Sequence, residues 1–266
     1  RLARSKETLC TTCHRPAENV KFQHKPFEGA VCLDCHDPHG GATRSLLVGD
    51  NVGQLCGKCH EPPKDKVLHG PVAVGECLLC HNAHQSDNEK LTVAPGKDLC
   101  IKCHVEVGEL VANAAYAHGP AAVDCGACHF PHGGEERRLL RNEPKSICRT
   151  CHDSVAETLA KDTHVHGAMD GEKTCLGCHT PHASQFKSQL RAVAGELCLT
   201  CHDKEIVNPT TKKRVANVAK DLAAAKFKHG PVQTGDCQGC HFPHSSSHVK
   251  LLRESYPAAF YKEFAE

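Results

Sequence analysis

The sequence predicts a mostly irregular chain with short α-helices, little or no β-sheet, and a core that is not made of side chains. Three observations predict this fold class. The chain has 266 residues but no Trp, one Met, three Tyr and eight Phe. It contains 20 Cys, all of them in one short motif. That motif recurs along the whole chain, which indicates an elongated array of stacked repeats.

Every cysteine belongs to a Cys-x-x-Cys-His motif, and the motif occurs ten times. The cysteine pairs are Cys10 and Cys13, Cys32 and Cys35, Cys56 and Cys59, Cys77 and Cys80, Cys100 and Cys103, Cys125 and Cys128, Cys148 and Cys151, Cys175 and Cys178, Cys198 and Cys201, and Cys237 and Cys240. The histidines that close the motifs are His14, His36, His60, His81, His104, His129, His152, His179, His202 and His241.

This spacing is typical of the attachment site of c-type haem. Two cysteines one helical turn apart can bond one porphyrin edge, and the adjacent histidine can bind the iron on its proximal side. A single motif could be a redox dithiol followed by a chance histidine, but ten matches in ten exclude chance. A zinc site usually adds a separate histidine pair, whereas here the histidine directly follows the second cysteine. The sequence therefore predicts ten covalently attached c-type haems.

The haems also explain the composition. Leu, Ile, Val and Phe are sparse for a globular domain of this length, and such a composition alone leans towards disorder. The porphyrins, which are large apolar plates, would take the place of the missing layers of secondary structure. We therefore expect the chain to be unfolded without haem.

The motifs alternate between two kinds, and one motif of each kind forms a two-haem repeat. The odd motif is preceded by Leu or Ile, whereas the even motif is followed by another histidine three residues on. We expect a single decahaem domain, residues 1–266, with linkers such as Leu46-Leu47 and Leu139-Leu140 between its repeats. The five repeats cover approximately residues 9–47, 55–91, 99–140, 147–190 and 197–252.

Two segments depart from the repeat. The last repeat carries an insert in which residues 212–227 show near-helical apolar spacing, which predicts a helix. Residues 253–266 form a C-terminal tail that contains Tyr256, Phe260, Tyr261 and Phe264. We expect this tail to cap the last haem, and a docking segment for a partner or a further copy is the alternative.

Ten further histidines stand at fixed places in the repeats and are the candidates for the distal side of the irons. Those upstream of the even motifs are His24, His69, His118, His166 and His229, and those that follow the even motifs are His39, His84, His132, His182 and His244. The count matches two histidines at every iron, with His164 and His248 left over, and the sole Met169 could serve one iron at most.

The spacing of His36 and His39 restricts which iron each of them can bind. On a helix their Cβ atoms would lie about 5–6 Å apart on one face, whereas two axial ligands approach an iron from opposite sides. His39 must therefore bind a neighbouring haem, and the same holds after every even motif. Each even motif thereby fastens two haems side by side.

Within this constraint we assign the distal histidines inside each repeat. The histidine after the even motif would serve the odd haem, and the upstream histidine would serve the even haem after a sharp turn at Gly-Pro sequences such as Gly70-Pro71. Exchange between repeats, and replacement of His166 by His164, are the open alternatives. The expected pairs are His39 with His14, His84 with His60, His132 with His104, His182 with His152, His244 with His202, His24 with His36, His69 with His81, His118 with His129, His166 with His179, and His229 with His241.

Charge and hydropathy restrict the partners and the location. The formal net charge of the chain is +1, and Lys and Arg are spread along it, so nucleic acid is not an expected partner. No apolar stretch reaches the roughly 18 residues of a transmembrane helix. Because c-type haem is attached outside the cytoplasm, we expect an exported protein whose leader has been removed, either periplasmic, outer-membrane-associated or extracellular.

The doubled motifs with His-Gly-Pro and His-x-Pro-His sequences resemble the multihaem c-type cytochromes of the doubled C-x-x-C-H class over residues 9–253. Within that class the chain is similar to the periplasmic decahaem subunit of porin–cytochrome conduits and to extracellular cytochrome filament subunits. The resemblance implies electron transfer through closely packed bis-His haems, in extracellular electron transfer or anaerobic respiration. It also implies redox proteins, an outer-membrane porin or further copies as partners.

Two other functions are the alternatives. One is a filament-forming cytochrome, which shares the same chemistry. The other is a multihaem reductase, which needs an iron with an open coordination position. No motif has Lys in place of His, and no motif lacks a candidate distal histidine, so an electron-transfer protein without a catalytic residue is the favoured hypothesis.

Overall fold

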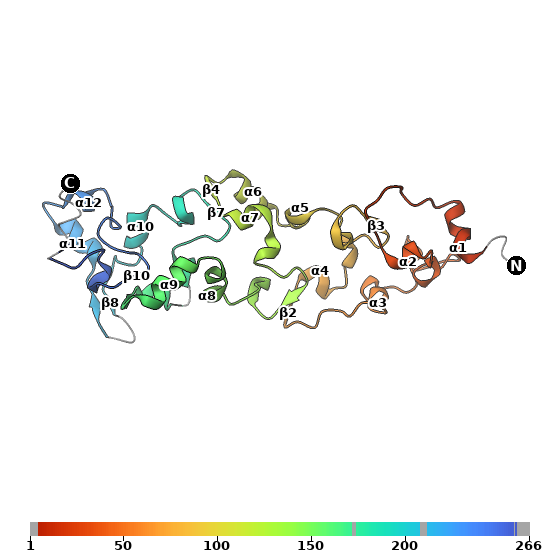
Figure 1. Cartoon of the computed structure of the whole chain (residues 1–266), viewed down its shortest axis with the longest axis horizontal. Coiled ribbons are helices and arrows are strands. Elements are labelled where there is room, and N and C mark those ends of the chain that lie inside the picture. Colours follow the sequence, from red (N-terminus) through yellow and green to blue (C-terminus); the bar gives the residue numbers. More distant parts are fainter. Residues whose placement is uncertain (1–4, 172–173, 208–211, 258, 260–266) are drawn as a thin grey trace. The chain divides into compact units, whose positions relative to one another are not determined.

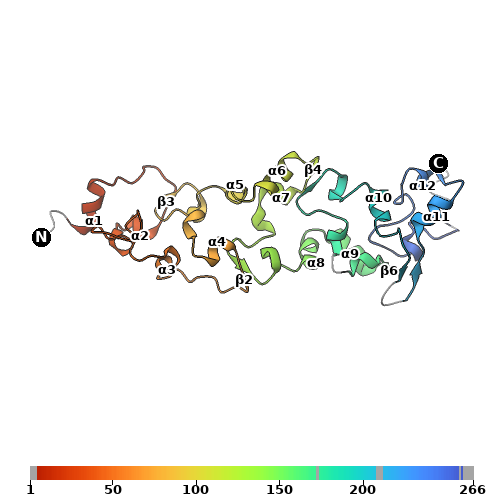
Figure 2. The same cartoon turned by 180° about the vertical axis from the view of Figure 1, so that it is seen from behind.

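The computed structural model describes residues 5–171, 174–207, 212–257 and 259 (Figures 1 and 2). The chain falls into two compact units, of which unit 1 comprises residues 1–106 and 123–141, and unit 2 comprises residues 107–122 and 142–266. As the sequence predicted, most of the described chain is irregular, with short helices and only two-stranded sheets. That the units form one decahaem domain stays a prediction.

The helices are short because the motifs and the Gly-Pro sequences interrupt them repeatedly. They are α1 (Lys6–Leu9), α2 (Lys25–Glu28), α3 (Val52–Cys56), α4 (Gly70–Ala73), α5 (Gly96–Ile101), α6 (Val105–Asn113), α7 (Gly119–Val123), α8 (Pro144–Ile147), α9 (Asp153–Lys161), α10 (Ala194–Leu199), α11 (Val218–Ala224) and α12 (Gly230–Gln233). Short 3₁₀ turns add to them at Cys10–Thr12, Cys32–Asp34, Cys77–Leu79, Cys125–Ala127, Cys148–Thr150, Gly167–Met169 and Thr174–Gly177.

Four small sheets join one repeat to the next. The strands of the described chain are β1 (Phe22–Gln23), β2 (Val67–Leu68), β3 (Gln85–Ser86), β4 (Tyr116–Ala117), β5 (Gly133–Gly134), β6 (His164–Val165), β7 (Ala183–Ser184), β8 (Ile206–Val207), β9 (Arg214–Val215) and β10 (Ser245–Ser246). Of these, β8 and β9 pair with each other within the last repeat. The antiparallel pairs are β1 with β3, β2 with β5, β4 with β7, and β6 with β10. In each pair, the strand before an upstream histidine lies beside the strand that follows the next repeat's even motif.

A tight loop closes each even motif. The motif histidine forms a β-bridge eleven residues further on, as His81 does with Thr92. Further 3₁₀ turns lie just before the bridge, at Glu89–Leu91, Arg137–Leu139, Lys187–Gln189 and Val249–Leu251. Their last two residues are left-handed, with φ of +57° at both Lys90 and Leu91. The leucine-rich linkers of the sequence therefore belong to this loop.

Side chains of this protein bury little apolar surface. Among the described residues the buried hydrophobic side chains are Ala94, Met169 and Ala183, and no large side chain is fully buried. Leucines and valines are widely exposed, with Leu79 at 58% and Val123 at 72%. This is the situation that the composition indicated, in which the polypeptide alone provides no core.

The loop after the last even motif depends on a buried serine. Ser246 is 2% exposed, and its hydroxyl donates to the Leu252 carbonyl at 2.5 Å and accepts from the His248 N–H at 2.9 Å. We expect Ser246→Ala to destabilise unit 2 by about 1–3 kcal/mol, because it leaves the carbonyl and the amide without their partner. Thermal unfolding of the holoprotein measures this effect. The control is Ser247→Ala, which loses only a bond between exposed groups; an equal effect of both changes would contradict the prediction.

Three expectations from the sequence are modified. The helix expected at residues 212–227 is shorter, because Lys212 is left-handed, β9 precedes it, and Asn217 caps its first turn by accepting from the Lys220 N–H at 2.8 Å. The Gly-Pro sequences begin helices α4, α7 and α12 rather than simple turns, with proline in the first turn as its fixed φ favours. Most of the aromatic tail, including Phe260, Tyr261 and Phe264, lies outside the described residues.

Candidate functional site

Each Cys-x-x-Cys-His motif is folded as a single helical turn. In all ten motifs the histidine N–H donates to the carbonyl of the first cysteine, at 2.9 to 3.1 Å. This turn gives the two cysteines the spacing that attachment to one porphyrin edge requires. The odd motifs continue from a preceding helix, as Cys56 ends α3, whereas the even motifs begin a new turn, as Cys77 does.

Cysteines of successive motifs lie against one another. Cys100 lies near Cys125, and burial followed by the interaction between the two thiols raises the pKa of Cys100 to about 11. Cys198 stands in the same relation to Cys237, and its pKa is also raised to about 11. On the other side of the repeat, burial and then nearby Cys103 raise the pKa of Cys80. The attachment points of neighbouring motifs are therefore close on both sides.

The even-motif histidines present only one ring nitrogen for binding. Their Nδ1 atoms lie 2.7 to 2.9 Å from a backbone carbonyl nine residues further on, as His81 does from Lys90. Three upstream histidines, His24, His69 and His118, do the same across the repeat boundary, with Nδ1 at 2.9 to 3.0 Å from a backbone carbonyl. A donated Nδ1–H fixes the tautomer, so that Nε2 is left as an acceptor for a metal.

The upstream histidines face the odd-motif histidines of the next repeat. His24 lies opposite His60 with 5.8 Å between the ring centres, and the planes are nearly parallel at 22°. The corresponding pairs are His69 with His104 at 6.1 Å, His118 with His152 at 6.1 Å, and His166 with His202 at 6.2 Å. In the last of these pairs the facing ring is His166, and not the left-over His164.

The histidines after the even motifs face the even-motif histidines of the preceding repeat. The pairs are His36 with His84 at 5.9 Å, His81 with His132 at 5.9 Å, and His179 with His244 at 6.1 Å. Burial, followed by repulsion from the facing ring, lowers the pKa of His132 and of His244. Neutral imidazoles are the form in which histidine binds a metal.

The structure therefore brings together pairs other than those assigned within repeats. His132, for example, faces His81 of the preceding repeat and not His104 of its own. The physical reason is the strand pairing. The His69 N–H donates to the His132 carbonyl at 2.9 Å, next to the paired strands β2 and β5, so these two histidines lie side by side. His69 then faces His104, whereas His132 faces His81. This is the exchange between repeats that the sequence left open.

The separation of the paired rings fits a metal ion between them. Two metal–nitrogen bonds of about 2 Å each, with half a ring on either side, place the ring centres roughly 6 Å apart. Directly stacked aromatic rings also fall within about 4.5–7 Å, so the distance alone does not discriminate. The hydrogen-bonded Nδ1 atoms favour a metal site over direct stacking, because they leave Nε2 as the nitrogen that can bind an ion. No cluster of three or more metal-binding side chains occurs in the described residues.

Two glycine contacts hold odd and even motifs together. A Cβ on Gly195, at the start of α10, would lie 2.5 Å from the Gly235 carbonyl oxygen, and a Cβ on Gly53 would lie 2.8 Å from Gly75 Cα. These contacts bring α10 against the turn before Cys237, and α3 against the turn before Cys77.

We expect Gly195→Ala to destabilise the holoprotein by about 1–3 kcal/mol, because the backbone of one segment must move to admit the methyl group. The measurement is thermal unfolding of the fully loaded protein. Gly230→Ala is the matched control, since nothing lies within 4 Å of the added carbon. Equal midpoints for the two variants would show that the close approach has no role.

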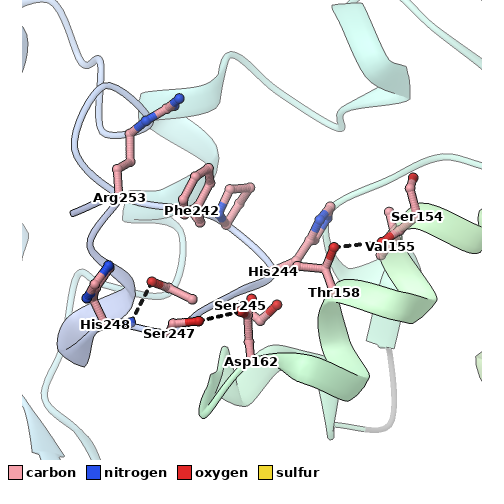
Figure 3. A pocket seen from close by; sticks show the side chains of 12 residues that line it. Ser154, Val155, Thr158, Asp162, Phe242, His244, Ser245, Ser247, His248 and Arg253 are labelled. Atoms are coloured by element: carbon pink, nitrogen blue, oxygen red, sulfur yellow. Dashed lines mark hydrogen bonds between the residues drawn. The ribbon is translucent and has the colours of Figure 1, made fainter. Parts of the chain in front are cut away.

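Unit 2 also contains a cavity of about 380 Å³ beside the last even motif (Figure 3). His244 and the serines after it form one side, and Thr158 of α9 and Asp162, which follows α9, form the other side. The Ser247 hydroxyl donates to the Asp162 carboxylate at 3.0 Å and fastens the two sides together. The cavity adjoins the ring that faces His179, so it belongs to the same site.

Comparison with known proteins agrees with this organisation. The chain matches the family described as the doubled CXXCH motif in five segments, residues 24–65, 69–109, 118–157, 166–206 and 229–259. It is also 32% identical over 115 residues to the multiheme cytochrome MtrA of Shewanella baltica (strain OS185). That alignment covers 41% of this chain and 33% of the relative, so the chain is matched to about a third of that protein's length.

Among the described residues no helix is long and apolar enough to cross a membrane. The repeated motifs, their uniform helical turn and the paired imidazoles account for ten covalent c-type haem sites. The chain is a multihaem c-type cytochrome and belongs to the doubled CXXCH family.

Proposed function

We propose that this protein conducts electrons along a series of closely spaced haems, each bound by two histidines. The observation that carries the proposal is the set of imidazole pairs with ring centres 5.8 to 6.2 Å apart, found in both compact units. The cysteines attach the haems, the motif histidines are the proximal ligands, and the upstream and following histidines are the distal ligands.

The chain's residues act by holding and saturating the sites. With two imidazoles in place an iron has no open position for a substrate, and its contribution is one-electron exchange at low potential compared with a His/Met site. The carbonyls bound to Nδ1 keep the rings in orientation, so that little reorganisation accompanies a change of charge. This favours electron transfer over the reductase alternative.

The proximity of successive motifs supports conduction over isolated sites. The cysteines approach one another in alternation, as Cys100 lies near Cys125 while Cys80 lies near Cys103. Such neighbours occur from the first motif to the sixth and from the eighth to the tenth.

Location and partners follow from the family and from the relative. Covalent haem attachment supports an exported protein, periplasmic, outer-membrane-associated or extracellular. The similarity to a multiheme cytochrome supports redox proteins as donors and acceptors. The resemblance in the motifs supports an outer-membrane porin, or further copies of the chain, as the structural partner in extracellular electron transfer or anaerobic respiration.

The test replaces one proposed distal ligand. We expect His118→Ala to convert one iron of the oxidised holoprotein from low spin to high spin and to let that iron bind cyanide. The variant should also pass electrons along the series of haems more slowly. Electron paramagnetic resonance and stopped-flow reduction measure these effects. His164→Ala is the control, because this ring faces no other imidazole in the described part of the chain. High-spin iron at most sites of the unmodified protein would refute the proposal.

A further inference from the structure

One position in the loop after each even motif carries a positive charge in three repeats and no charge in the other two. This position lies thirteen residues after the second cysteine of the motif. In all five repeats its N–H donates to the carbonyl of that cysteine, at 2.9 to 3.0 Å. The five repeats therefore share one backbone contact here and differ in the side chain. The residues at this position are Val48, Val93, Arg141, Arg191 and Arg253.

The side chain of each arginine also binds the motif. Nε of Arg191 donates to the Leu176 carbonyl at 2.8 Å. Arg141 through Nε and Arg253 through Nη1 donate to the equivalent carbonyls of their own motifs. Each acceptor stands directly after the first cysteine of its motif. The positive charge therefore lies beside the helical turn to which one haem is attached.

Aromatic rings hold two of these guanidinium groups in place. The guanidinium carbon of Arg141 lies 4.4 Å from the centre of the Phe130 ring. In the last repeat, that of Arg253 lies 4.8 Å from the centre of the Phe242 ring. Such cation–π contacts orient a cation over the face of a ring. Both phenylalanines directly follow the motif histidine, where the two repeats with valine have no aromatic residue.

A fixed positive charge at this place favours the reduced state of the attached haem. Reduction from ferric to ferrous iron adds one electron, so the net charge of the site falls by one unit. A nearby cation attracts the more negative state. The three arginines are exposed, so water and salt screen part of their charge. We expect a change of about threefold to tenfold in the reduction equilibrium of one haem, where tenfold corresponds to about 59 mV for one electron.

We propose that arginine at this position raises the reduction potential of the haem on the same even motif above the potential that valine would give. The haems attached beside His129, His179 and His241 are therefore the ones that hold an electron more tightly. The inference needs only the covalent attachment of haem to the even motifs, and not the identity of the distal ligands. It goes beyond the proposed function because it assigns residues that decide where along the series electrons reside.

The experiment is a potentiometric titration of the 266-residue holoprotein with dithionite and redox mediators, followed by haem absorbance. Replacing the three arginines together, Arg141→Val/Arg191→Val/Arg253→Val, should move about three tenths of the absorbance change to lower potential, because three of ten haems are affected. The reverse change, Val93→Arg, should move about one tenth to higher potential. The Val93 side chain is 41% exposed, so the loop has room for the longer residue.

Two controls separate the charge from the fold and from the net charge of the chain. Lysine at all three positions keeps the charge and should titrate as the unmodified protein does. Lys64→Val/Lys161→Val/Arg214→Val also removes three positive charges, but from exposed ion pairs elsewhere. This variant should leave the titration curve unchanged, and mass spectrometry should show ten haems in every variant.

An unchanged curve for the triple valine variant would overturn the inference. Equal shifts in the valine and lysine variants, or in the valine and ion-pair variants, would overturn it too. If the triple valine variant loses haem, Val93→Arg decides alone, and an unchanged or lowered potential there would contradict the inference. High-spin iron at most sites of the unmodified protein would refute the proposed function and leave this inference standing.

Discussion

Chain produced without haem attachment is expected to lack a cooperative fold. The described residues bury only Ala94, Met169 and Ala183 among hydrophobic side chains, and no large side chain is fully buried. Hydrophobic burial must offset a conformational entropy cost of roughly 1–2 kcal/mol per ordered residue. The four inter-repeat sheets have two residues in each strand, and two-stranded pairs of this kind are marginal in water. The polypeptide alone therefore cannot hold the structure.

The measurement compares the chain with Ala at all 20 cysteines with the fully loaded protein. Circular dichroism should show mainly coil and no thermal transition, and amide exchange should be fast throughout. A second variant, Cys77→Ala/Cys80→Ala, separates local from global loss. Because each repeat contacts its neighbours, protection should fall around this motif and remain in unit 2. A cooperative transition of the haem-free chain would contradict the prediction.

His132→Ala is expected to open the iron bound by His81 in the preceding repeat. The two ring centres are 5.9 Å apart, whereas sequence reasoning paired His132 with His104 of its own repeat. His104 instead faces His69 at 6.1 Å. The expected result is one high-spin iron that binds cyanide, a raised potential at that site, and slower passage of electrons through unit 1.

A second variant, which lacks one haem, identifies the iron that has lost its ligand. In Cys100→Ala/Cys103→Ala the haem of the His104 motif is absent, and mass spectrometry should show one haem fewer. Adding His132→Ala to this background should still produce one new high-spin iron, because its iron belongs to His81. If His132 served His104, no new signal would appear. His248→Ala provides the control for a histidine that faces no ring in the described chain.

Much of the site could be predicted from sequence because covalent chemistry imposes it. The motif requires a helical turn, and the argument from His36 and His39 predicts that these two bind different haems. In the structure His36 faces His84 and not His39. The sequence did not identify the partner of each histidine, because the same repeat and a neighbouring repeat both contain a histidine at a suitable separation along the chain. The choice is made by strand pairs of two residues, such as Phe22 with Ser86, which have no distinct sequence signal.

Other details were hidden for a different reason. Leu91, Leu139 and Leu251 adopt left-handed backbone conformations that leucine rarely takes, so propensity argues against the loops that they form. Gly195 and Gly235 approach within a contact that no pattern of a single sequence reveals. The fold class was easier, because the lack of large apolar side chains excludes a layered protein whatever the local conformations are.

The offset between repeats has a consequence for how such chains change length over generations. A duplicated repeat running from one odd motif to the next would receive an axial group from each flanking repeat and supply one to each in return. Tandem gain or loss of such a cassette would leave every internal coordination sphere intact. Gain or loss of one repeat by gene duplication or deletion would therefore change the number of haems by two without any compensating substitution.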